Sequence, residues 1–293
     1  MYLIIGASSF IGNNLYNYCK KENIEVLGTY YKNCRNEEFV YFDIMQDSIL
    51  DLCNRHSLTN VKGVVICGAN ANIDSCKRNE ETSNQLNVVG TKRLLKEADQ
   101  LGIKSVFLSS EAVFDGKKGM YKEEDIPNPV TTYGKQKLQV EQYIIENLSD
   151  FLIFRISRAT DSKFGEKDIF HEFYTKIMSN QEIVCLKNQS FCLTHIDDIV
   201  KGIIDAIEIN LKGLYHLSSS NYISRYELAN MYVNNFFEEY EKIYEKEFEE
   251  MPFMDNRHIY AGLNGEKLSK ILEINYQNLN VIMDRYGETY KLL

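Results

Sequence analysis

The stretch "LIIGASSFIGNNLYNYC", from Leu3 to Cys19, decides the fold of this chain. An apolar run ends at Gly6, Gly12 opens an amphipathic segment, and Ser9 stands where a third glycine would complete a Gly-x-x-Gly-x-x-Gly turn. Glycines at a strand-to-helix turn let the backbone approach a pyrophosphate, whose charge the helix N-terminus favours. The stretch therefore predicts a dinucleotide-binding turn at the first βα junction, with a tight turn that binds nothing as the alternative.

Short apolar runs alternate with longer helical patterns through the first half of the chain. The runs that we predict to be strands are residues 2–6, 25–31, 39–44, 62–69, 104–110 and 151–156. Amphipathic stretches such as Val88 to Gly102 lie between most of them. Continuous apolar strands separated by helices are typical of a parallel sheet covered on both faces. The predicted fold class is therefore α/β, a doubly wound parallel Rossmann-type sheet.

The regular alternation stops after residue 155. Helical patterns follow at 171–180 and 198–210, a further strand is predicted at 213–219, and the Glu-, Lys- and Tyr-rich segment 225–250 predicts a largely solvated helix. These patterns predict a smaller C-terminal substrate-binding lobe that is interleaved with the first domain. The predicted limits are 1–158 for the dinucleotide-binding domain, to which 191–213 also contributes, and 159–293 for the lobe.

Composition excludes several classes of protein. The net charge of −9 provides no basic surface for nucleic acid or for an acidic membrane, although a local site can still bind a small anion. No apolar run approaches membrane-spanning length. Seven cysteines without CxxC pairs predict reduced thiols and a cytoplasmic location. His195 with Asp197 and Asp198 predicts a strand-to-helix junction with a capping Asp rather than a metal site, and we expect no metal.

The cations after the second predicted strand bear on the choice of cofactor. The segment "KNCR" offers Lys32 and Arg35 and no carboxylate. A free ribose 2′-hydroxyl usually meets an Asp or Glu at this point, whereas a 2′-phosphate prefers a cation. NADP(H) is therefore favoured over NAD(H), and two solvated loop cations are the alternative. Asp43, which ends the third predicted strand, is either an adenine contact or a turn cap.

The stretch "TTYGKQKLQVEQ" (131–142) places one tyrosine before two lysines. Positions four apart share a helix face and positions two apart do not, so Lys137 can reach toward Tyr133 and Lys135 cannot. A neighbouring ammonium favours the phenolate, so we expect Lys137 to lower the pKa of Tyr133 from its ordinary value of about 10. The pair predicts a proton-transfer site, and a chance pairing on a solvated helix is the alternative.

The stretch "VFLSSEAVFDG" (106–116) ends a predicted strand with two serines. Open α/β sheets bind their ligands at the carboxyl ends of their strands. Ser110 is thus placed to hydrogen-bond a substrate carbonyl or hydroxyl while Tyr133 exchanges its proton. The alternative is that serines commonly end strands.

The glycine turn, the strand-ending serine and the Tyr-x-x-x-Lys helix, in this order, resemble the extended short-chain dehydrogenase/reductase superfamily. Within it, the chain is most similar to the dTDP-4-dehydrorhamnose reductases and their sugar-nucleotide relatives. The resemblance covers nearly the whole chain, and it rests on the segments "GASSFIG", "LNVVGTKRLL", "SSEAVFDG", "YKEEDIPNPVTTYGKQKLQVEQ", "FRIS", "THIDDIVKGI" and "RHIYAGLNGEKLSKIL". Each segment alone is moderately specific for the family, and seven segments in the family's order are strong evidence for the resemblance.

The resemblance implies a catalytic group of Ser110, Tyr133 and Lys137, and a structural asparagine at Asn87. The expected cofactor site consists of Gly6, Ser8, Ser9, Phe10, Ile11, Gly12, Lys32, Arg35, Asp43, Ile44, Gly68, Ala69, Asn87, Tyr133 and Lys137. The expected substrate contacts are Glu111, Arg155, Arg158 and Arg257. Arginines suit a diphosphate through bidentate bonding. A structural ion pair is the alternative for Arg155 or Arg158, and a solvated surface position is the alternative for Arg257.

The chain departs from the family pattern directly after the catalytic hydroxyl. Glu111 and Ala112 stand where the family has an Asp-Tyr pair. Sugar-nucleotide 4,6-dehydratases need two acids at these positions to remove water, and Ala112 cannot serve as one, which disfavours dehydration. The loss of the tyrosine also indicates a substrate pocket that differs from that of a standard rhamnose-pathway reductase.

These features predict NADP(H)-dependent reduction of the 4-keto group of a nucleotide-linked deoxysugar. Tyr133 would protonate the developing alkoxide, Lys137 would hold the cofactor ribose, and Ser110 would polarise the carbonyl oxygen. Two alternatives stay open: a nucleotide-sugar 4-epimerase, which uses the same residues but keeps its cofactor bound, and a non-catalytic NADP-binding regulatory subunit, as in methionine adenosyltransferase. The expected partners are the nucleotide sugar and a second copy in a homodimer, without nucleic acid or membrane.

Overall fold

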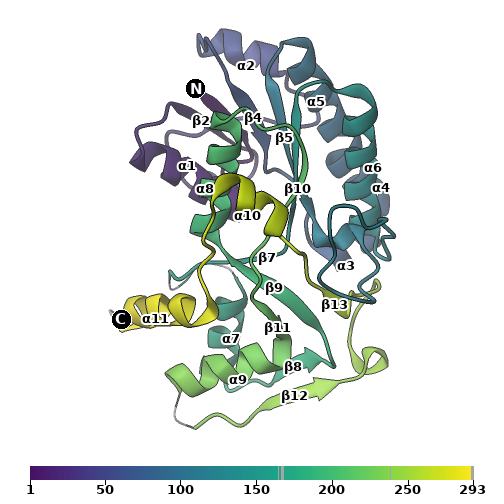
Figure 1. Ribbon diagram of the computed structural model, residues 1–293, viewed down its shortest axis with the longest axis vertical. Helices are drawn as coiled ribbons and strands as arrows, with labels where there is room; N and C mark the ends of the chain where they lie inside the picture. The colour runs from purple at the N-terminus through teal and green to yellow at the C-terminus, as the bar shows by residue number, and fades with distance from the viewer. Residues whose placement is uncertain (164, 166–167, 238, 292–293) are drawn as a thin grey trace.

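A seven-stranded parallel sheet runs through the larger part of the computed structural model, which describes residues 1–163, 165, 168–237 and 239–291 (Figure 1). The strand order is β10-β6-β5-β4-β1-β2-β3, and every neighbouring pair is parallel. The strands are β1 (Tyr2–Ile5), β2 (Val26–Tyr30), β3 (Val40–Tyr41), β4 (Gly63–Ile66), β5 (Lys104–Ser110), β6 (Phe151–Ile156) and β10 (Gly213–Leu217). The predicted fold class is confirmed. The chain order reverses between β1 and β4, where doubly wound sheets bind their ligands.

Helices cover both faces of this sheet (Figure 1). They are α1 (Phe10–Lys21), α2 (Ile49–Arg55), α3 (Ile73–Arg78), α4 (Glu80–Asn84), α5 (Thr91–Gln100), α6 (Thr132–Asn147), α8 (Ile196–Glu208) and α10 (Glu266–Leu272), with a π-helical turn at Gln85–Gly90. Leu15 of α1 and Ile203 of α8 belong to the core on one face, and Leu94 of α5 and Ile144 of α6 belong to the core on the other. Because both faces are covered, β1 and β4 are buried at every position, and their sequences are apolar without alternation.

A smaller lobe with its own core lies at the other end of the molecule (Figure 1). One of its sheets pairs β9 (Ser190–His195) with β7 (Arg158–Thr160), β11 (Tyr222–Ser224) and β13 (Tyr260–Ala261), and a second pairs β8 (Ile183–Leu186) with β12 (Ile243–Lys246). The helices of the lobe are α7 (Ile169–Met178), α9 (Arg225–Phe236) and α11 (Leu279–Tyr290). The chain passes between the two parts several times, because α8, β10 and α10 return to the large sheet. The predicted limits at 158 and 159 stay a prediction.

The prediction of a largely solvated helix over residues 225–250 is wrong. The helix α9 ends at Phe236, and its residues Leu228 and Tyr232 are fully buried in the core of the lobe. Residues 243–246 form the strand β12 instead of continuing the helix. Leu228 and Tyr232 lie four positions apart and so share one helix face. Most of the Glu and Lys residues of the segment follow the helix, since α9 itself contains a single Glu, Glu227, and no Lys.

Two findings concern the chemistry of the chain as a whole. All seven cysteines are free thiols, as their spacing predicted, and four of them are buried. Among the described residues, no helix is both long and apolar enough to cross a membrane.

Candidate active site

Glycine shapes the loop between β1 and α1. The φ angle of Gly6 is +84°, and a Cβ on this residue would lie 2.6 Å from the Cα of Gly68. A Cβ on Gly12 would lie 2.5 Å from the carbonyl oxygen of Gly6. Ser9 caps α1, because its Oγ accepts a hydrogen bond from the N–H of Gly12 at 3.2 Å. The turn therefore keeps open the space that a Cβ would fill, at a helix N-terminus, and it fits a pyrophosphate.

A cavity of about 570 Å³ lies over this turn, at the carboxyl ends of β1, β2 and β4. The predicted cofactor residues that line it are Gly6, Ser8, Ser9, Lys32, Asp43, Ile44, Gly68 and Ala69. The predicted residues outside its lining are Phe10, Ile11, Gly12, Arg35, Asn87, Tyr133 and Lys137. The lining residues that were not predicted are Ile5, Tyr30, Tyr31, Asn33, Phe42, Met45, Gln46, Thr82, Gln85 and Leu86. Two adjacent tyrosines directly before Lys32 were the available signal, because aromatic side chains commonly line cofactor sites.

Three of the predicted cofactor residues have distinct roles, and two of them, Lys32 and Asp43, line this cavity. Lys32 is exposed, and its Nζ lies 5.5 Å from the ring centroid of Tyr31. Asp43 accepts a hydrogen bond from the N–H of Met45 at 2.9 Å, so it caps a turn as well as lining the cavity. Asn87 bonds the N–H and the carbonyl of Asn70 at 2.8 and 2.9 Å. The amide of Asn87 also donates to Oε1 of Gln136 on α6 at 2.8 Å. Asn87 therefore has a structural role, as the family resemblance implied.

The first turn of α6 packs directly on the end of β5. A short 3-10 turn, Glu111–Val113, follows Ser110, and a Cβ on Gly134 would lie only 2.0 Å from the carbonyl oxygen of Ala112. Glycine directly after Tyr133 is therefore what lets α6 approach the strand that carries Ser110. Gly134 was not among the predicted site residues, and its place directly after Tyr133 in "TYGKQK" was the available signal.

Lys137 and Tyr133 share one face of α6, as predicted. Lys137 is only 6% exposed, and its Nζ donates to the carbonyl of Leu108 at 2.7 Å. The same Nζ lies 4.6 Å from the ring centroid of Phe107 and 5.6 Å from that of Tyr133. Lys135 is exposed on another face of the helix. The arrangement directs the lysine along the inner face of α6 toward the end of β5.

The expected lowering of the Tyr133 pKa is wrong. Burial raises the pKa of Tyr133, the nearby Cys76 adds to this, and a hydrogen bond with Ser110 opposes it only in part. Lys137 is not among the groups that shift the pKa of Tyr133, which are Cys76, Ser110 and Glu111 besides burial. Burial also lowers the pKa of Lys137 to about 8. Tyr133 thus keeps its proton at neutral pH, so it is suited to donate that proton.

A second cavity, of about 720 Å³, lies between the end of β5 and the C-terminal lobe. The predicted substrate residues Glu111, Arg158 and Arg257 line it. The charged lining residues that were not predicted are Glu172, Lys176, Arg225, Lys246 and Glu250. Among the described lining residues, five Lys and Arg side chains thus face three Glu side chains. The cavity is locally positive in a chain of net charge −9, which suits a diphosphate.

The arginines of this cavity differ in how far their donors are already used. Arg257 pairs with Asp74 at 2.7 Å, and Arg225 pairs with Glu172 at 2.6 Å. The guanidinium of Arg158 lies 4.7 Å above the ring of Phe191, and its buried Nε has no hydrogen-bond partner among the described residues. Arg158 is therefore the arginine with the most donor capacity left for a ligand. Arg225 follows the cap Ser224 in "SRYE", a helix-start pattern that could have located it.

Glu111 lies beside Ser110 and lines the second cavity. Burial raises the pKa of Glu111 to about 8, while Arg158 acts in the opposite direction. The buried Oε2 atom has no hydrogen-bond partner within the part of the chain that the structure describes. The carboxyl is thus held largely protonated at neutral pH, where it can donate a hydrogen bond.

The sequence matches the family model of the RmlD substrate binding domain over residues 1–289. The chain belongs to this family. The predicted family resemblance is confirmed by this match. A hypothetical dTDP-4-dehydrorhamnose reductase from Sulfolobus tokodaii has the same fold, with a TM-score of 0.84 at 24% identity over 97% of this chain and 98% of that chain. A dTDP-4-dehydrorhamnose reductase from Bacillus anthracis in complex with NADP has a TM-score of 0.83 at 19% identity over 100% and 99% of the two chains. The methionine adenosyltransferase 2 subunit beta of Bos taurus is 28% identical over 245 residues, which cover 78% of this chain and 69% of that protein.

One predicted substrate contact of this RmlD-family chain needs correction. Arg155 does not line the second cavity. It is 3% exposed, and its guanidinium forms a bidentate ion pair with Glu141 of α6, with Nη2 of Arg155 2.7 Å from Oε2 of Glu141. The structural ion pair, which was the alternative, is therefore the role that the structure shows.

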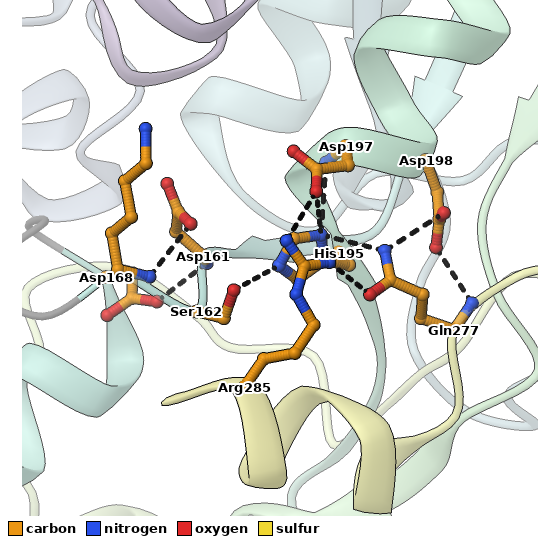
Figure 2. A network of polar contacts seen from close by, with 9 residues as sticks. Asp161, Ser162, Asp168, His195, Asp197, Asp198, Gln277 and Arg285 are labelled. Carbon is orange, nitrogen blue, oxygen red and sulfur yellow. Dashed lines mark hydrogen bonds and ion pairs between the residues drawn. The ribbon is translucent and has the colours of Figure 1, made fainter. Parts of the chain in front are cut away.

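A polar network joins α11 to the start of α8 in this RmlD-family chain (Figure 2). His195, and not an Asp as predicted, caps α8, because its Nδ1 accepts from the N–H of Asp197 at 3.2 Å. Gln277 also lies 3.0 Å from this Nδ1, and Oγ of Ser162 lies 3.1 Å from Nε2. Asp197 pairs in turn with Arg285 of α11.

Ser162 and Asp197 lie on either side of the His195 ring, as the serine and the aspartate do in a hydrolase triad, but the three residues do not form a triad. Nδ1 of His195 accepts a hydrogen bond, so the proton of the neutral ring is on Nε2, which points at Ser162. An imidazole in this tautomer cannot take the serine proton. His195 is fully buried and Ser162 is 4% exposed. The network therefore anchors the C-terminal helix. Separately, no group of three or more His, Cys, Asp or Glu among the described residues could hold a metal ion.

Proposed function

We propose that this RmlD-family chain is an NADP(H)-dependent reductase that acts on the 4-keto group of a nucleotide-linked deoxysugar. The observation that carries the proposal is that Ser110, Tyr133 and Lys137 lie beside one another and next to residues of both cavities. Lys137 lies beside Cys67, which precedes Gly68 of the first cavity, and Glu111 of the second cavity follows Ser110. A dinucleotide in the first cavity and a sugar in the second would meet at these three side chains.

The first cavity suits NADP(H). The glycine turn accepts a pyrophosphate, and Lys32 on the rim is placed to meet a ribose 2′-phosphate. The Bacillus anthracis reductase, which shares the fold, holds NADP. NAD(H) is the alternative cofactor, because the side chain of Lys32 is exposed and can remain in solvent beside a ribose without a 2′-phosphate.

The residues of the chain would divide the work of carbonyl reduction. The bound nicotinamide supplies the hydride that reduces the keto carbon. Tyr133, which keeps its proton at neutral pH, donates that proton to the oxygen as negative charge develops there. Ser110, bonded to Tyr133, holds the same oxygen in place. Lys137, whose Nζ lies 5.6 Å from the ring centroid of Tyr133, would hold the cofactor ribose beside the tyrosine.

The second cavity supports a nucleotide sugar as the substrate. Arg158 has an unpaired buried donor for a phosphate oxygen, and Lys176 and Lys246 add positive charge near the cavity wall. Glu111 in its protonated form is placed to bond a sugar oxygen beside Ser110. Dehydration needs two adjacent acidic side chains after the catalytic hydroxyl. This chain has only one, Glu111, because the next residue is Ala112.

A panel of nucleotide 4-ketosugars, screened for NADPH oxidation at a wavelength of about 340 nm, tests the proposal. We expect turnover with at least one 4-keto-6-deoxysugar nucleotide and loss of NADPH in proportion to the alcohol formed. An epimerase would instead interconvert two sugar epimers without added NADPH and would purify with its cofactor bound. Either of those results overturns the reductase.

A second candidate function is a cofactor-binding regulatory subunit. The likeness to the methionine adenosyltransferase 2 subunit beta, at 28% identity over 245 residues, favours it. Such a subunit would bind NADPH and would reduce no sugar in the panel, while changing the activity of a partner enzyme. The enclosed Ser110, Tyr133 and Lys137 group supports the reductase over this candidate, because a purely regulatory role does not require a proton donor.

A further inference from the structure

A buried polar cluster lies directly behind the candidate catalytic residues. Ser109 donates from Oγ to Oε1 of Glu141 at 2.5 Å. Arg155 donates from Nε to Oε1 of Glu141 at 3.0 Å and from Nη2 to Oε2 at 2.7 Å. Glu141 is 1% exposed and Arg155 is 3% exposed. A single carboxylate on α6 is thus held at once by β5, through Ser109, and by β6, through Arg155.

The outer side of Arg155 ends on neutral groups. Its Nη1 lies 3.4 Å from Nε2 of His216, whose Nδ1 lies 3.1 Å from the carbonyl oxygen of Tyr121. A carbonyl can only accept, so Nδ1 carries the proton and Nε2 accepts from Arg155. Burial and the charge of Arg155 lower the pKa of His216 to about 3, so the ring stays neutral. The guanidinium also lies 4.9 Å from the ring centroid of Phe114. The charge of Arg155 is therefore balanced by Glu141 within the cluster.

The cluster joins the two segments that carry the candidate catalytic groups. Ser109 directly precedes Ser110 on β5, and Glu141 lies one helical turn beyond Lys137 and two turns beyond Tyr133 on α6. We propose that Glu141 and Arg155 are positioning residues, which fix the distance of Tyr133 and Lys137 from Ser110. This inference rests on the proposed function and adds to it the part of the fold that holds the site together.

Stability alone is a weak reason for such a pair. Removing two charges from water costs more than a well-packed apolar pair of the same volume would cost. What the pair adds is direction, because bidentate bonding of a planar guanidinium fixes the angle as well as the distance between the two elements. Proton transfer depends on such geometry, and a displacement of about 1 Å can cost about a hundredfold in rate.

The test compares single and double replacements of the pair. Glu141→Gln or Arg155→Met strands one buried charge, so each should lower the Tm by about 5 to 10 °C and lower kcat. The double variant, Glu141→Gln with Arg155→Met, removes both charges, so its Tm should return toward that of the wild type. If the pair positions the site, kcat of the double variant stays about ten- to a hundredfold below wild type. Recovery of kcat together with the Tm overturns the inference.

A third replacement covers the case in which the charge variants fail to fold. Ser109→Ala removes one hydrogen bond to Glu141 and strands no charge. We expect the Tm to fall by only about 2 to 4 °C and kcat to fall by about three- to tenfold, while NADPH affinity is kept. Wild-type kcat in this variant also overturns the inference.

A matched control exists at the opposite end of the same strand. Lys104, the first residue of β5, is 4% exposed and pairs with Asp150. Lys104→Met disturbs an ion pair on β5 far from Ser110. It should lower the Tm and leave kcat within about twofold of wild type, because the amino end of β5 does not orient the site. A loss of kcat equal to that of Glu141→Gln would show that any damage to β5 has this effect and would overturn the inference.

A readout that needs no turnover separates this inference from the proposed function. The groups that face Lys137 are Cys67, Cys76, Glu141 and Tyr133, and the Glu141 carboxylate helps to keep Lys137 protonated. In Glu141→Gln the pH above which NADPH affinity falls should therefore move lower, measured by fluorescence titration. A wild-type protein that reduces no 4-ketosugar removes the proposed function, while this shift still supports the link between Glu141 and Lys137. An unchanged midpoint counts against that link even where the reductase is active.

Discussion

Replacing Glu111 by glutamine tests the electrostatics of the second cavity without any substrate. Burial raises the pKa of Glu111 from an ordinary 4.5 to about 8 in the folded protein. Between these two pH values the folded chain holds a proton that the unfolded chain has released, so stability falls as the pH rises. The stabilising contribution of the protonated carboxyl is complete below pH 4.5 and is lost as the pH rises to about 8. A glutamine side chain cannot ionise, so the Glu111→Gln variant avoids this loss.

The size of the effect follows from the difference between the two pKa values. That difference corresponds to about 4 to 5 kcal/mol in the free energy of unfolding, and to about 2 kcal/mol if water in the cavity solvates the carboxylate. Glu111 borders a cavity of about 720 Å³, so water can reach its neighbourhood. We expect the Tm of Glu111→Gln to exceed that of the wild type by about 4 to 10 °C at pH 9.

Thermal unfolding of both proteins at several pH values from 5 to 9 measures this. The gap in Tm should widen between pH 5 and pH 8 and then level off. Glu146→Gln is the matched control, because it makes the same chemical change at an exposed position of α6, and its Tm should follow the wild type at every pH. A gap for Glu111→Gln that is the same at pH 5 and pH 9 would refute the reasoning, because a carboxylate ionised throughout gives no such dependence.

Three further predictions concern the two candidate binding sites. Tyr133→Phe should keep NADPH affinity and lose about 10² to 10⁴ in kcat, because only the proton donor is removed. Lys135→Ala on the exposed face of the helix is the control. A Tyr133→Phe variant with more than half of wild-type kcat removes the tyrosine from the mechanism. Gly6→Ala should abolish NADPH binding, since its Cβ would lie 2.6 Å from the backbone of Gly68; a fluorescence titration with wild-type affinity contradicts the fit of the turn to a dinucleotide. Lys32→Ala should reduce the preference for NADPH over NADH by about ten- to a hundredfold, and an unchanged ratio of the two kcat/KM values shows that Lys32 is solvated.

The large sheet could be predicted because its strands carry their own signal. β1 and β4 are apolar at every position and buried on both faces, and glycine follows both strands closely, at Gly6 and Gly68. Segments with helical periodicity separate the strands. A parallel sheet covered by helices is the arrangement that buries all of these strands. The sequence therefore contained most of what was needed for this half of the fold.

The strands of the C-terminal lobe could not be predicted in the same way. β11 and β13 are three and two residues long, and β12 has no fully buried residue. Its Ile243 pairs with Ile183, a residue 60 positions earlier. Such strands exist because of partners far along the chain, and local periodicity does not report those partners.

The candidate site divides along the same line. The spacing of Tyr133 and Lys137 predicted their common helix face, because a helix relates positions four apart. The direction of the Tyr133 pKa was mispredicted, since it depends on how much burial the surrounding segments add. Arg155 at the end of β6 was also compatible with two roles. Only the packing of α6 on β6 shows that its guanidinium meets Glu141 rather than a ligand.

The fate of the hydride tests the central claim most directly. The protein is incubated with a nucleotide 4-ketosugar and NADPH that carries deuterium at C4 of the nicotinamide, and the product is examined by mass spectrometry and NMR. We predict one deuterium at sugar C4 for each NADPH consumed, and loss of this transfer in Tyr133→Phe. A 4-hydroxy product that contains no deuterium, or sugar epimers that interconvert while NADPH stays intact, would contradict reduction at this site.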